Sequence, residues 1–420
     1  MGKQVQEIRF LSTTHERVEG LMHRVNVASL LEAHHKQKSG KAVGVDGISK
    51  EEYGRNLMEN IGTLIESMKK FQYKPKPVKR TYIPKGDGKL RPLGIPSYED
   101  KLVQYVMAKL LEGVYEPRFL DCSYGFRPKR RPHDVIRYID KAVMKGNVNW
   151  VLEADIKGFF DNVDQKQLVE FLERDIADKN FIRYIVRIFK GGIMEEGKYY
   201  DCDKGTPQGG LVSPVLANVY LHYVLDMWMR DDVKPRMKGE MHYVRYADDF
   251  LVLFEYESDA QRVYTVLEKR LERFKLELAK DKTRIIPIGR NSGGKGEFDF
   301  LGFTCYDTLT RGGRYRLGVR SSSKKLKAKK QNVKLWLKEN MHKPVHTLLN
   351  SLDAKLRGHY GYYGVNGNFA SISKFADYVK CMLYKCLNRR SQRKSISFEK
   401  LIAIWAENIA KPRIMVQIWN

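Results

Sequence analysis

Two adjacent aspartates, Asp248 and Asp249, lie in the middle of an apolar segment, HYVRYADDFLVLF, at residues 242–254. Apolar residues on both sides predict two strands joined by a tight turn that carries the aspartates. Adjacent carboxylates repel each other and are costly to bury without a partner. A Mg²⁺ ion between them and a substrate phosphate would relieve the repulsion. A solvated acidic turn is the alternative, because other acidic pairs stand at 51–52, 195–196 and 231–232.

A third carboxylate, Asp155, ends a short apolar strand predicted in the segment WVLEADIKGFFD, residues 150–161. Phosphoryl transfer with two metal ions places the ions roughly 3.5–4 Å apart and needs carboxylates that bridge them. Together with the aspartate pair, Asp155 supplies such a set from a separate element. The alternative is that Asp155 caps a helix, but Asp161 and Asp164 are better placed for capping.

Two further segments could contact a nucleotide. Glycines in GTPQGGLVSP, residues 205–214, let the backbone approach a ligand closely, and a loop that leads into a helix can hold a base pair or a phosphate. In IPKGDGKLRPLGIP, residues 83–96, we expect a hairpin whose tip carries Lys85, Lys89 and Arg91 and could clamp a triphosphate. Each signal is weak by itself, because such loops and solvated basic hairpins are common.

The composition points to a nucleic-acid partner. The 420 residues include 76 Lys and Arg against 50 Asp and Glu, which gives a net charge of +26, and such a surplus is typical of proteins that bind polyanions. The 42% hydrophobic content excludes a disordered chain. Five cysteines without a C-x-x-C pair disfavour zinc fingers and disulfide scaffolds, and they indicate a reducing compartment.

The order of predicted elements indicates an α+β body followed by helices. Strands are expected at about 78–83, 90–95, 149–156 and on both sides of the aspartate pair, with helices between them. Ser49 and Glu52 predict a capping box that opens a helix to about Lys70. The apolar stretch at 211–229 predicts a buried helix and not a membrane span, because it contains Pro214, Asn218, His222 and Asp226.

The basic charge lies mostly in the last quarter of the chain. Residues 311–420 hold 24 Lys and Arg against 5 Asp and Glu, so +19 of the net charge lies there. Helical patterns dominate after Ser323. We therefore expect two domains, residues 1–310 and residues 311–420.

Four segments in a fixed order carry a family resemblance: SYGFRPKRRPHDVI (123–136), ADIKGFFDNV (154–163), TPQGGLVSPVLANVYL (206–221) and YADD (246–249). With them, the chain resembles the reverse transcriptases encoded by bacterial group II introns, in the form that lacks an HNH endonuclease domain. The resemblance covers residues 25–420. It implies a right-hand polymerase, with fingers and an antiparallel palm sheet in residues 1–310 and an all-helical thumb or maturase domain in residues 311–420.

The resemblance implies a catalytic centre with two Mg²⁺ ions, for which Mn²⁺ could substitute. Asp155 and Asp248 match the main metal ligands of the family and Asp249 matches the third acidic member. The carbonyl of Ile156 would complete the shell of one ion. The reaction implied is attack of a primer 3′-hydroxyl on an incoming deoxynucleoside triphosphate.

The resemblance also implies residues that bind the nucleotide. Lys85 and Arg91 match residues that hold the triphosphate, and Gln208 and Gly209 match the segment beside the nascent base pair. Phe160 matches the bulky side chain that excludes a ribose 2′-hydroxyl, although a core phenylalanine is the alternative. Lys282 matches a lysine that protonates pyrophosphate; its alternative is a surface lysine.

The resemblance also implies that a last group of residues contacts the primer and the RNA. They are the predicted primer turn and basic residues of the helical domain: Leu301, Gly302, Lys324, Lys325, Arg357, Arg389 and Arg390. Lys and Arg neutralise phosphates, and neighbouring Tyr and His can stack on bases. The expected partners are group II intron RNA or another RNA template, a DNA or RNA primer, deoxynucleoside triphosphates and target DNA, with no membrane.

The sequence therefore predicts an RNA-directed DNA polymerase, and the resemblance adds a maturase that aids intron splicing and retrohoming. It implies a bacterial cytoplasmic protein associated with a ribonucleoprotein or the nucleoid. The chain ends at Asn420 without a Cys- and His-rich tail, so we expect no second-strand cleavage. The alternatives are a splicing factor whose polymerase site is unused and a reverse transcriptase that serves host defence or repair.

Overall fold

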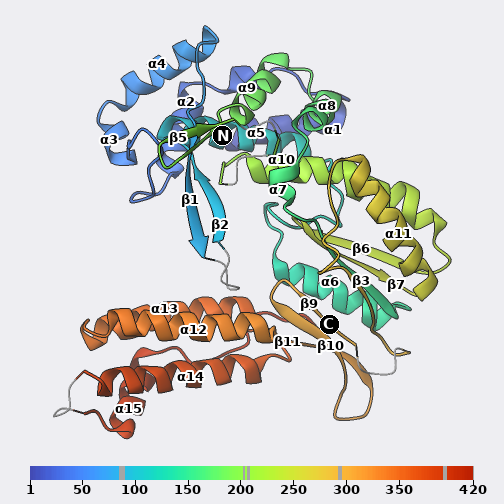
Figure 1. Cartoon of the computed structure of the whole chain (residues 1–420), viewed down its shortest axis with the longest axis vertical. Helices are drawn as coiled ribbons and strands as arrows, with labels where there is room; N and C mark the ends of the chain where they lie inside the picture. The colour runs from blue at the N-terminus through green and yellow to red at the C-terminus, as the bar shows by residue number, and fades with distance from the viewer. Residues whose placement is uncertain (85–89, 202–203, 206–208, 292–295, 391–394, 420) are drawn as a thin grey trace.

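The computed structural model of the chain describes residues 1–420 except 85–89, 202–203, 206–208, 292–295, 391–394 and 420. In the described residues, strands form three sheets, with strand orders β2-β1-β4-β5, β6-β7-β3-β8 and β11-β10-β9. Helices follow the last sheet as far as Asn408 (Figure 1). This arrangement confirms the predicted α+β class with helices in the last part.

The N-terminal part consists of helices and a hairpin. Figure 1 shows the β1–β2 hairpin pointing from this helical layer toward the C-terminal helices. The elements are α1 (Gly2–Thr14), η1 (Met22–Arg24), α2 (Val27–Lys36), α3 (Lys50–Arg55), α4 (Leu57–Lys69), β1 (Val78–Pro84), β2 (Leu90–Ile95) and α5 (Tyr98–Tyr115).

The single helix predicted to run to about Lys70 is wrong. Ser49 does cap its start, because its hydroxyl accepts the Glu52 backbone N–H at 3.1 Å. The helix breaks at Asn56, however, where φ is −121° and ψ is 44°. The Asn60 side chain donates to the Tyr53 carbonyl at 3.0 Å, so a side chain takes the acceptor that a continuous helix would use.

The middle of the chain carries the largest set of elements. They are α6 (Pro132–Lys145), β3 (Trp150–Asp155), α7 (Phe159–Asn162), α8 (Gln165–Asp175), α9 (Lys179–Phe189), β4 (Ile193–Glu195), β5 (Lys198–Tyr200), α10 (Ser213–Leu221), η2 (His222–Asp226), η3 (Met229–Val233), η4 (Lys234–Arg236), β6 (Met241–Tyr246), β7 (Asp249–Phe254), α11 (Glu257–Arg273) and β8 (Arg284–Pro287). The apolar stretch at 211–229 is the buried helix α10 continued by a π-helical turn, η2.

The central sheet is buried on both faces, and this burial fixes the register of β7, the strand that begins at Asp249. Side chains of β7 alternate as the strand period requires. Phe250, Val252 and Phe254 belong to a core shared with α5, α10 and α11. Leu251 and Leu253 belong to a second core shared with α6 and the C-terminal helices. A register slip of β7 would therefore expose or misplace every one of these side chains.

The C-terminal part begins with the third sheet and ends in helices. Its elements are β9 (Glu297–Phe300), β10 (Phe303–Leu309), β11 (Tyr315–Ser321), α12 (Ser323–Asn340), α13 (Val345–Tyr363), α14 (Phe369–Asn388) and α15 (Phe398–Asn408). The predicted division at residue 310 falls in the connection between β10 and β11 and stays a prediction. The expectation that residues 311–420 are all-helical is wrong, because this range begins with strand β11, which pairs with β10. No helix in the described ranges is long and apolar enough to cross a membrane.

Candidate active site

The aspartate pair lies at a two-residue turn between β6 and β7, as predicted. Tyr246 faces Asp249 across the hairpin, and Ala247 and Asp248 connect the strands. Ala247 adopts a left-handed conformation with φ of 58°. On the other side of β7, Asp155 is the register partner of Asp249. The fold therefore places the three predicted carboxylates at one end of adjacent strands.

The charges of this centre are poorly balanced by protein groups alone. Desolvation, followed by repulsion from Asp248 and Asp155, raises the pKa of Asp249 to about 7. Desolvation also raises the pKa of Asp248, and Arg91 opposes that shift. The Asp249 residue is exposed to water, so solvent screening reduces the contribution of this pKa shift to stability.

A lysine amine supplies a positive charge to this centre. Lys282 ion-pairs with Asp155, and this hydrogen bond raises the pKa of the lysine. Within the described ranges, no group of three or more His, Cys, Asp or Glu side chains has converged into a metal site. The donor set nevertheless fits Mg²⁺, which prefers oxygen ligands and takes one or two carboxylates together with substrate phosphates.

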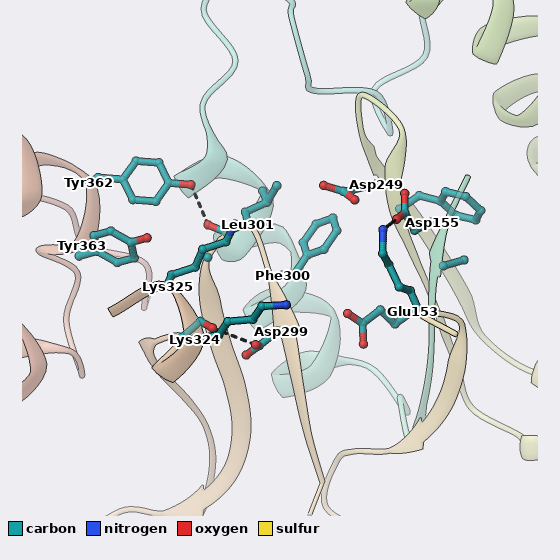
Figure 2. A pocket seen from close by; sticks show the side chains of 15 residues that line it. Glu153, Asp155, Asp249, Asp299, Phe300, Leu301, Lys324, Lys325, Tyr362 and Tyr363 are labelled. Carbon is teal, nitrogen blue, oxygen red and sulfur yellow. Dashed lines mark hydrogen bonds and ion pairs between the residues drawn. The ribbon is translucent and has the colours of Figure 1, made fainter. Parts of the chain in front are cut away.

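A cavity of about 480 Å³ opens beside the carboxylates (Figure 2). Figure 2 shows that one wall carries Asp155 and Asp249 and that the opposite wall carries lysines and tyrosines from the C-terminal part. Seven residues predicted from the sequence line this cavity: Asp155, Asp249, Lys282, Leu301, Gly302, Lys324 and Lys325. The fold thus brings Asp155 and Asp249 to one cavity with the predicted primer residues, whereas Asp248, at the adjoining turn, does not line it.

The predicted primer turn is held by helix α13. Leu301 and Gly302 connect β9 to β10, and both have positive φ, 50° and 79°. The Tyr362 hydroxyl donates to the Leu301 carbonyl at 2.7 Å. A Cβ on Gly302 would lie 2.8 Å from the Tyr363 hydroxyl oxygen. Glycine is required at this position for its conformation and for the close approach of the tyrosine.

The structure describes only some of the residues that were predicted to bind the nucleotide. Lys85 and Gln208 lie outside the described residues. Arg91 is close enough to lower the pKa of Asp248, against the effect of desolvation. Gly209 has φ of 106°, and a Cβ there would lie 2.3 Å from the Gly94 carbonyl oxygen. Gly209 therefore packs against strand β2.

The two phenylalanines after Asp155 have different surroundings. Phe159 is buried in the core at 2% exposure, whereas Phe160 is half-buried at the edge of that core. Ile156, whose carbonyl is a predicted ligand, is also buried. One phenylalanine is thus a core residue, as the sequence suggested, and Phe160 is the one that remains accessible.

Three predicted RNA-binding arginines lie away from the cavity lining. Arg357 is on α13 and pairs with Asp353 at 2.5 Å. Arg389 follows the last residue of α14, and Arg390 donates to the Lys343 carbonyl at 2.7 Å. Their role in RNA binding stays a prediction.

Sequence reasoning missed Arg245, which holds the turn that carries Asp248. Its side chain is 0% exposed. Its guanidinium donates two bonds to Asp226, at 2.7 and 2.6 Å, and one each to Asn218 at 2.9 Å and Ser123 at 2.8 Å. The fifth bond goes to the Ala247 carbonyl at 3.0 Å. The available signal was three polar residues, at 218, 226 and 245, inside otherwise apolar segments.

An antiparallel sheet with carboxylates at one end of adjacent strands, across a cavity from lysines of the C-terminal part, is the arrangement expected of a nucleic-acid polymerase. The family model for reverse transcriptase (RNA-dependent DNA polymerase) matches residues 83–305. The chain belongs to this family, and it is an RNA-directed DNA polymerase, as predicted.

Curated relatives agree with this assignment. Group II intron-encoded protein LtrA of Lactococcus lactis subsp. cremoris is 30% identical over 451 aligned residues, which cover 88% of this chain and 74% of LtrA. Protein YkfC of Escherichia coli K12 is 33% identical, covering 67% of this chain and 80% of YkfC. Nuclear intron maturase 1 of Arabidopsis thaliana is 33% identical over 90 residues, 21% of this chain and 12% of that protein.

Proposed function

We propose that Asp155, Asp248 and Asp249 form the metal-binding centre of a reverse transcriptase that extends a primer on an RNA template. The observation that carries this proposal is the cross-strand register of Asp155 with Asp249, with Asp248 at the adjoining turn. Carboxylates from two strands can hold ions on one side of a reacting phosphate. The carbonyl of Ile156 would supply a further oxygen ligand.

The remaining residues act on the nucleotide and on the leaving group. Mg²⁺, or Mn²⁺ in its place, supplies activation of the primer 3′-hydroxyl and neutralisation of pyrophosphate when it is bound at these carboxylates. Arg91, with Lys85, holds the triphosphate by charge-assisted hydrogen bonds. Phe160 excludes a 2′-hydroxyl, and Lys282 donates a proton to the departing pyrophosphate.

The cavity wall opposite the carboxylates binds the primer. Leu301 and Gly302 set the position of its 3′ end, and Lys324 and Lys325 neutralise phosphates of the duplex. The basic surplus of the C-terminal part supports RNA binding there. The similarity to LtrA, whose name describes an intron-encoded protein, supports a second role in which this part binds group II intron RNA as a maturase.

The polymerase proposal is tested by primer extension on an RNA template with variants of single carboxylates. We expect Asp155→Asn and Asp249→Asn each to reduce extension by about a thousandfold, because metal ions contribute several kcal/mol to such reactions. The matched control is Asp231→Asn, which changes one member of an exposed acidic pair on η3. Equal loss in the control variant, or full activity in Asp155→Asn, would contradict the assignment.

The maturase proposal needs a separate readout. We expect the purified chain to accelerate splicing of a group II intron RNA transcribed from the DNA that surrounds its coding sequence. The Asp155→Asn variant should retain this acceleration, because splicing by the RNA does not use the polymerase centre. No acceleration by either protein would remove the maturase role and leave the polymerase proposal intact.

A further inference from the structure

An exposed aromatic side chain, Phe126, lies beside the residue proposed to select deoxynucleotides. Phe126 is 51% exposed, and its ring centroid is 6.5 Å from that of Phe160, with the ring planes at 78°. Phe160 also contacts Phe159, at 5.4 Å and 67°. Both are edge-to-face arrangements within the range in which aromatic pairs attract each other. The Phe160 ring therefore touches one buried and one exposed ring.

The loop that carries Phe126 is fixed to the catalytic hairpin. The Tyr124 backbone N–H donates to the Arg245 carbonyl at 2.9 Å. The Asn218 side chain donates to the Gly125 carbonyl at 2.7 Å. A Cβ on Gly125 would lie 2.3 Å from the Ala247 nitrogen, so only glycine allows this approach. The residue before Phe126 is thus packed against the turn that bears Asp248.

The residue after Phe126 fixes the other side of the loop. Arg127 is buried, and its guanidinium ion-pairs with Glu116 at 3.2 Å. It also donates to the carbonyls of Leu120 at 2.7 Å and Ser123 at 2.8 Å. These bonds leave Phe126 little choice of backbone conformation.

Phe126 itself has a strained backbone, with φ of 58°. A bulky residue rarely adopts this left-handed conformation, which persists only where the surroundings impose it and which is often found at functional sites. Glycine would relieve the strain, yet an exposed phenylalanine occupies the position. The strained backbone and the exposure of Phe126 therefore indicate that its aromatic ring has a function.

The backbone of Phe160 packs closely against Gly205, whereas its side chain is only partly covered. A Cβ on Gly205 would lie 2.8 Å from the Phe160 carbonyl oxygen, and Gly158, with φ of 55°, precedes helix α7. Phe160 is half-buried, so part of the residue is exposed to solvent. A gate against a 2′-hydroxyl works only if the ring cannot rotate away.

We infer that Phe126 is a positioning residue for sugar selection, because its ring limits rotation of the Phe160 ring. The inference rests on the proposed role of Phe160. Phe126 reaches the incoming nucleotide through Phe160, and it links the gate to the loop that packs on the catalytic hairpin.

Sugar selection is measured by single-nucleotide extension of a primer on an RNA template, with kcat/KM determined for dATP and for ATP. We expect Phe126→Ala to lower the dATP-to-ATP ratio about threefold to tenfold, the equivalent of one aromatic pair, by raising kcat/KM for ATP. Phe126→Tyr should keep the ratio because it keeps the ring. The matched control is Phe10→Ala, which removes an exposed phenylalanine of α1.

A double-mutant cycle separates positioning from direct contact. If Phe126 acts through Phe160, the double variant with Phe126→Ala and Phe160→Ala should have the ratio of Phe160→Ala alone. Additive effects, or a change in KM for dATP without a change in the ratio, would overturn the inference in favour of direct contact with the nucleic acid.

The dATP-to-ATP ratios of Phe126→Ala and Phe160→Ala separate a failure of the role inferred for Phe126 from a failure of the role proposed for Phe160. An unchanged ratio in Phe126→Ala, with a reduced ratio in Phe160→Ala, would overturn the inference alone. An unchanged ratio in Phe160→Ala would remove the sugar-selecting role of Phe160, and the inference with it. Circular dichroism and a thermal melt of each variant exclude misfolding as the cause.

Discussion

The guanidinium of Arg245 and the carboxylate of Asp226 form an ion pair from which water is excluded, with both side chains 0% exposed. The pair joins the π-helical turn η2 to the last part of β6, one residue pair before the turn that carries Asp248. Burial of two charges is costly, and the cost is offset only when every donor has a partner. All five N–H groups of Arg245 have one.

We predict that Arg245→Lys lowers kcat for extension by about tenfold to a hundredfold, because small displacements of a reacting centre have effects of this size. A lysine keeps the charge but cannot reproduce the planar fork that also binds the Ala247 carbonyl. RNA affinity should not change. Wild-type kcat in Arg245→Lys would show that the bond to the turn has no part in catalysis.

Removal of one partner of the buried Arg245–Asp226 ion pair should lower the free energy of unfolding. Asp226→Ala leaves the guanidinium buried and unpaired, so the free energy of unfolding should fall by about 3–5 kcal/mol. Urea denaturation measures this change. The comparison variant is Asp231→Ala, whose carboxylate pairs with Arg230 on the exposed surface and should cost less than about 1 kcal/mol.

The Tyr362 hydroxyl offers a test of whether helix α13 holds the turn that is proposed to position the primer 3′ end. Tyr362→Phe removes the 2.7 Å hydrogen bond to the Leu301 carbonyl and leaves the ring in place. Since such a bond contributes about 0.5–1.5 kcal/mol, KM for primer–template should rise about twofold to tenfold with little change in kcat. Tyr378→Phe, which removes a longer bond of 3.4 Å to Lys330, serves as the control. Equal effects of the two variants would contradict the prediction.

Charge at the cavity wall predicts how RNA binding depends on salt. Replacing both Lys324 and Lys325 with Gln should reduce the slope of log affinity against log salt concentration by about 1.4–1.8, if each lysine contacts one phosphate. The adjacent pair of Lys69, the last residue of α4, and Lys70, its C-cap, gives a control with the same chemistry. An unchanged slope in the first variant would place the phosphate contacts elsewhere.

Truncation of the C-terminal helices would not isolate their contribution to RNA binding. Core residues of α12, α13 and α14 pack in one cluster with Leu251 and Leu253 of the palm strand β7. A truncated chain would expose that shared core, and loss of RNA binding would then report misfolding as readily as lost contacts.

A buried histidine predicts that the helical domain is sensitive to acid. His359 is 2% exposed and packs on Phe375, with ring centroids 4.2 Å apart. Desolvation, and then the charge of Lys329, lower the pKa of His359 to about 3. The folded protein therefore binds this proton less readily than the unfolded chain does.

Because the folded pKa lies below the unfolded value near 6.5, this histidine's contribution to stability is present above pH 6.5 and is lost as pH falls. The slope is at most about 1.4 kcal/mol per pH unit. In His359→Asn this part of the pH dependence should disappear between pH 7 and pH 5, whereas the exposed His346→Asn should leave it unchanged. Identical profiles for wild type and His359→Asn would contradict the prediction.

Local patterns in the sequence were sufficient to predict the elements of the site. The aspartate turn, the strand that ends at Asp155 and the cap at Asp164 depend on residues within a few positions of one another. Apolar alternation and turn chemistry report such features directly. The exception is the break at Asn56, which depends on one side-chain hydrogen bond from Asn60.

Contacts between distant segments could not be predicted in this way. Lys282 meets Asp155 across 127 positions of sequence, and Tyr362 meets Leu301 across 61. No periodicity encodes which tyrosine will reach which carbonyl. Phe126 and Arg245 were missed for the same reason, because their partners come from elements that only the fold brings together.

The most direct test of the central claim is primer extension on an RNA template with Mg²⁺, comparing wild type with Asp248→Asn and offering deoxy- and ribonucleotides separately. RNA affinity of both proteins is measured in parallel. We predict extension by the wild type with deoxynucleotides, little with ribonucleotides, and none by the variant, with equal RNA affinity. Extension by Asp248→Asn at the wild-type rate, or RNA binding by the wild type without any extension, would contradict the assignment of the three aspartates as the polymerase centre.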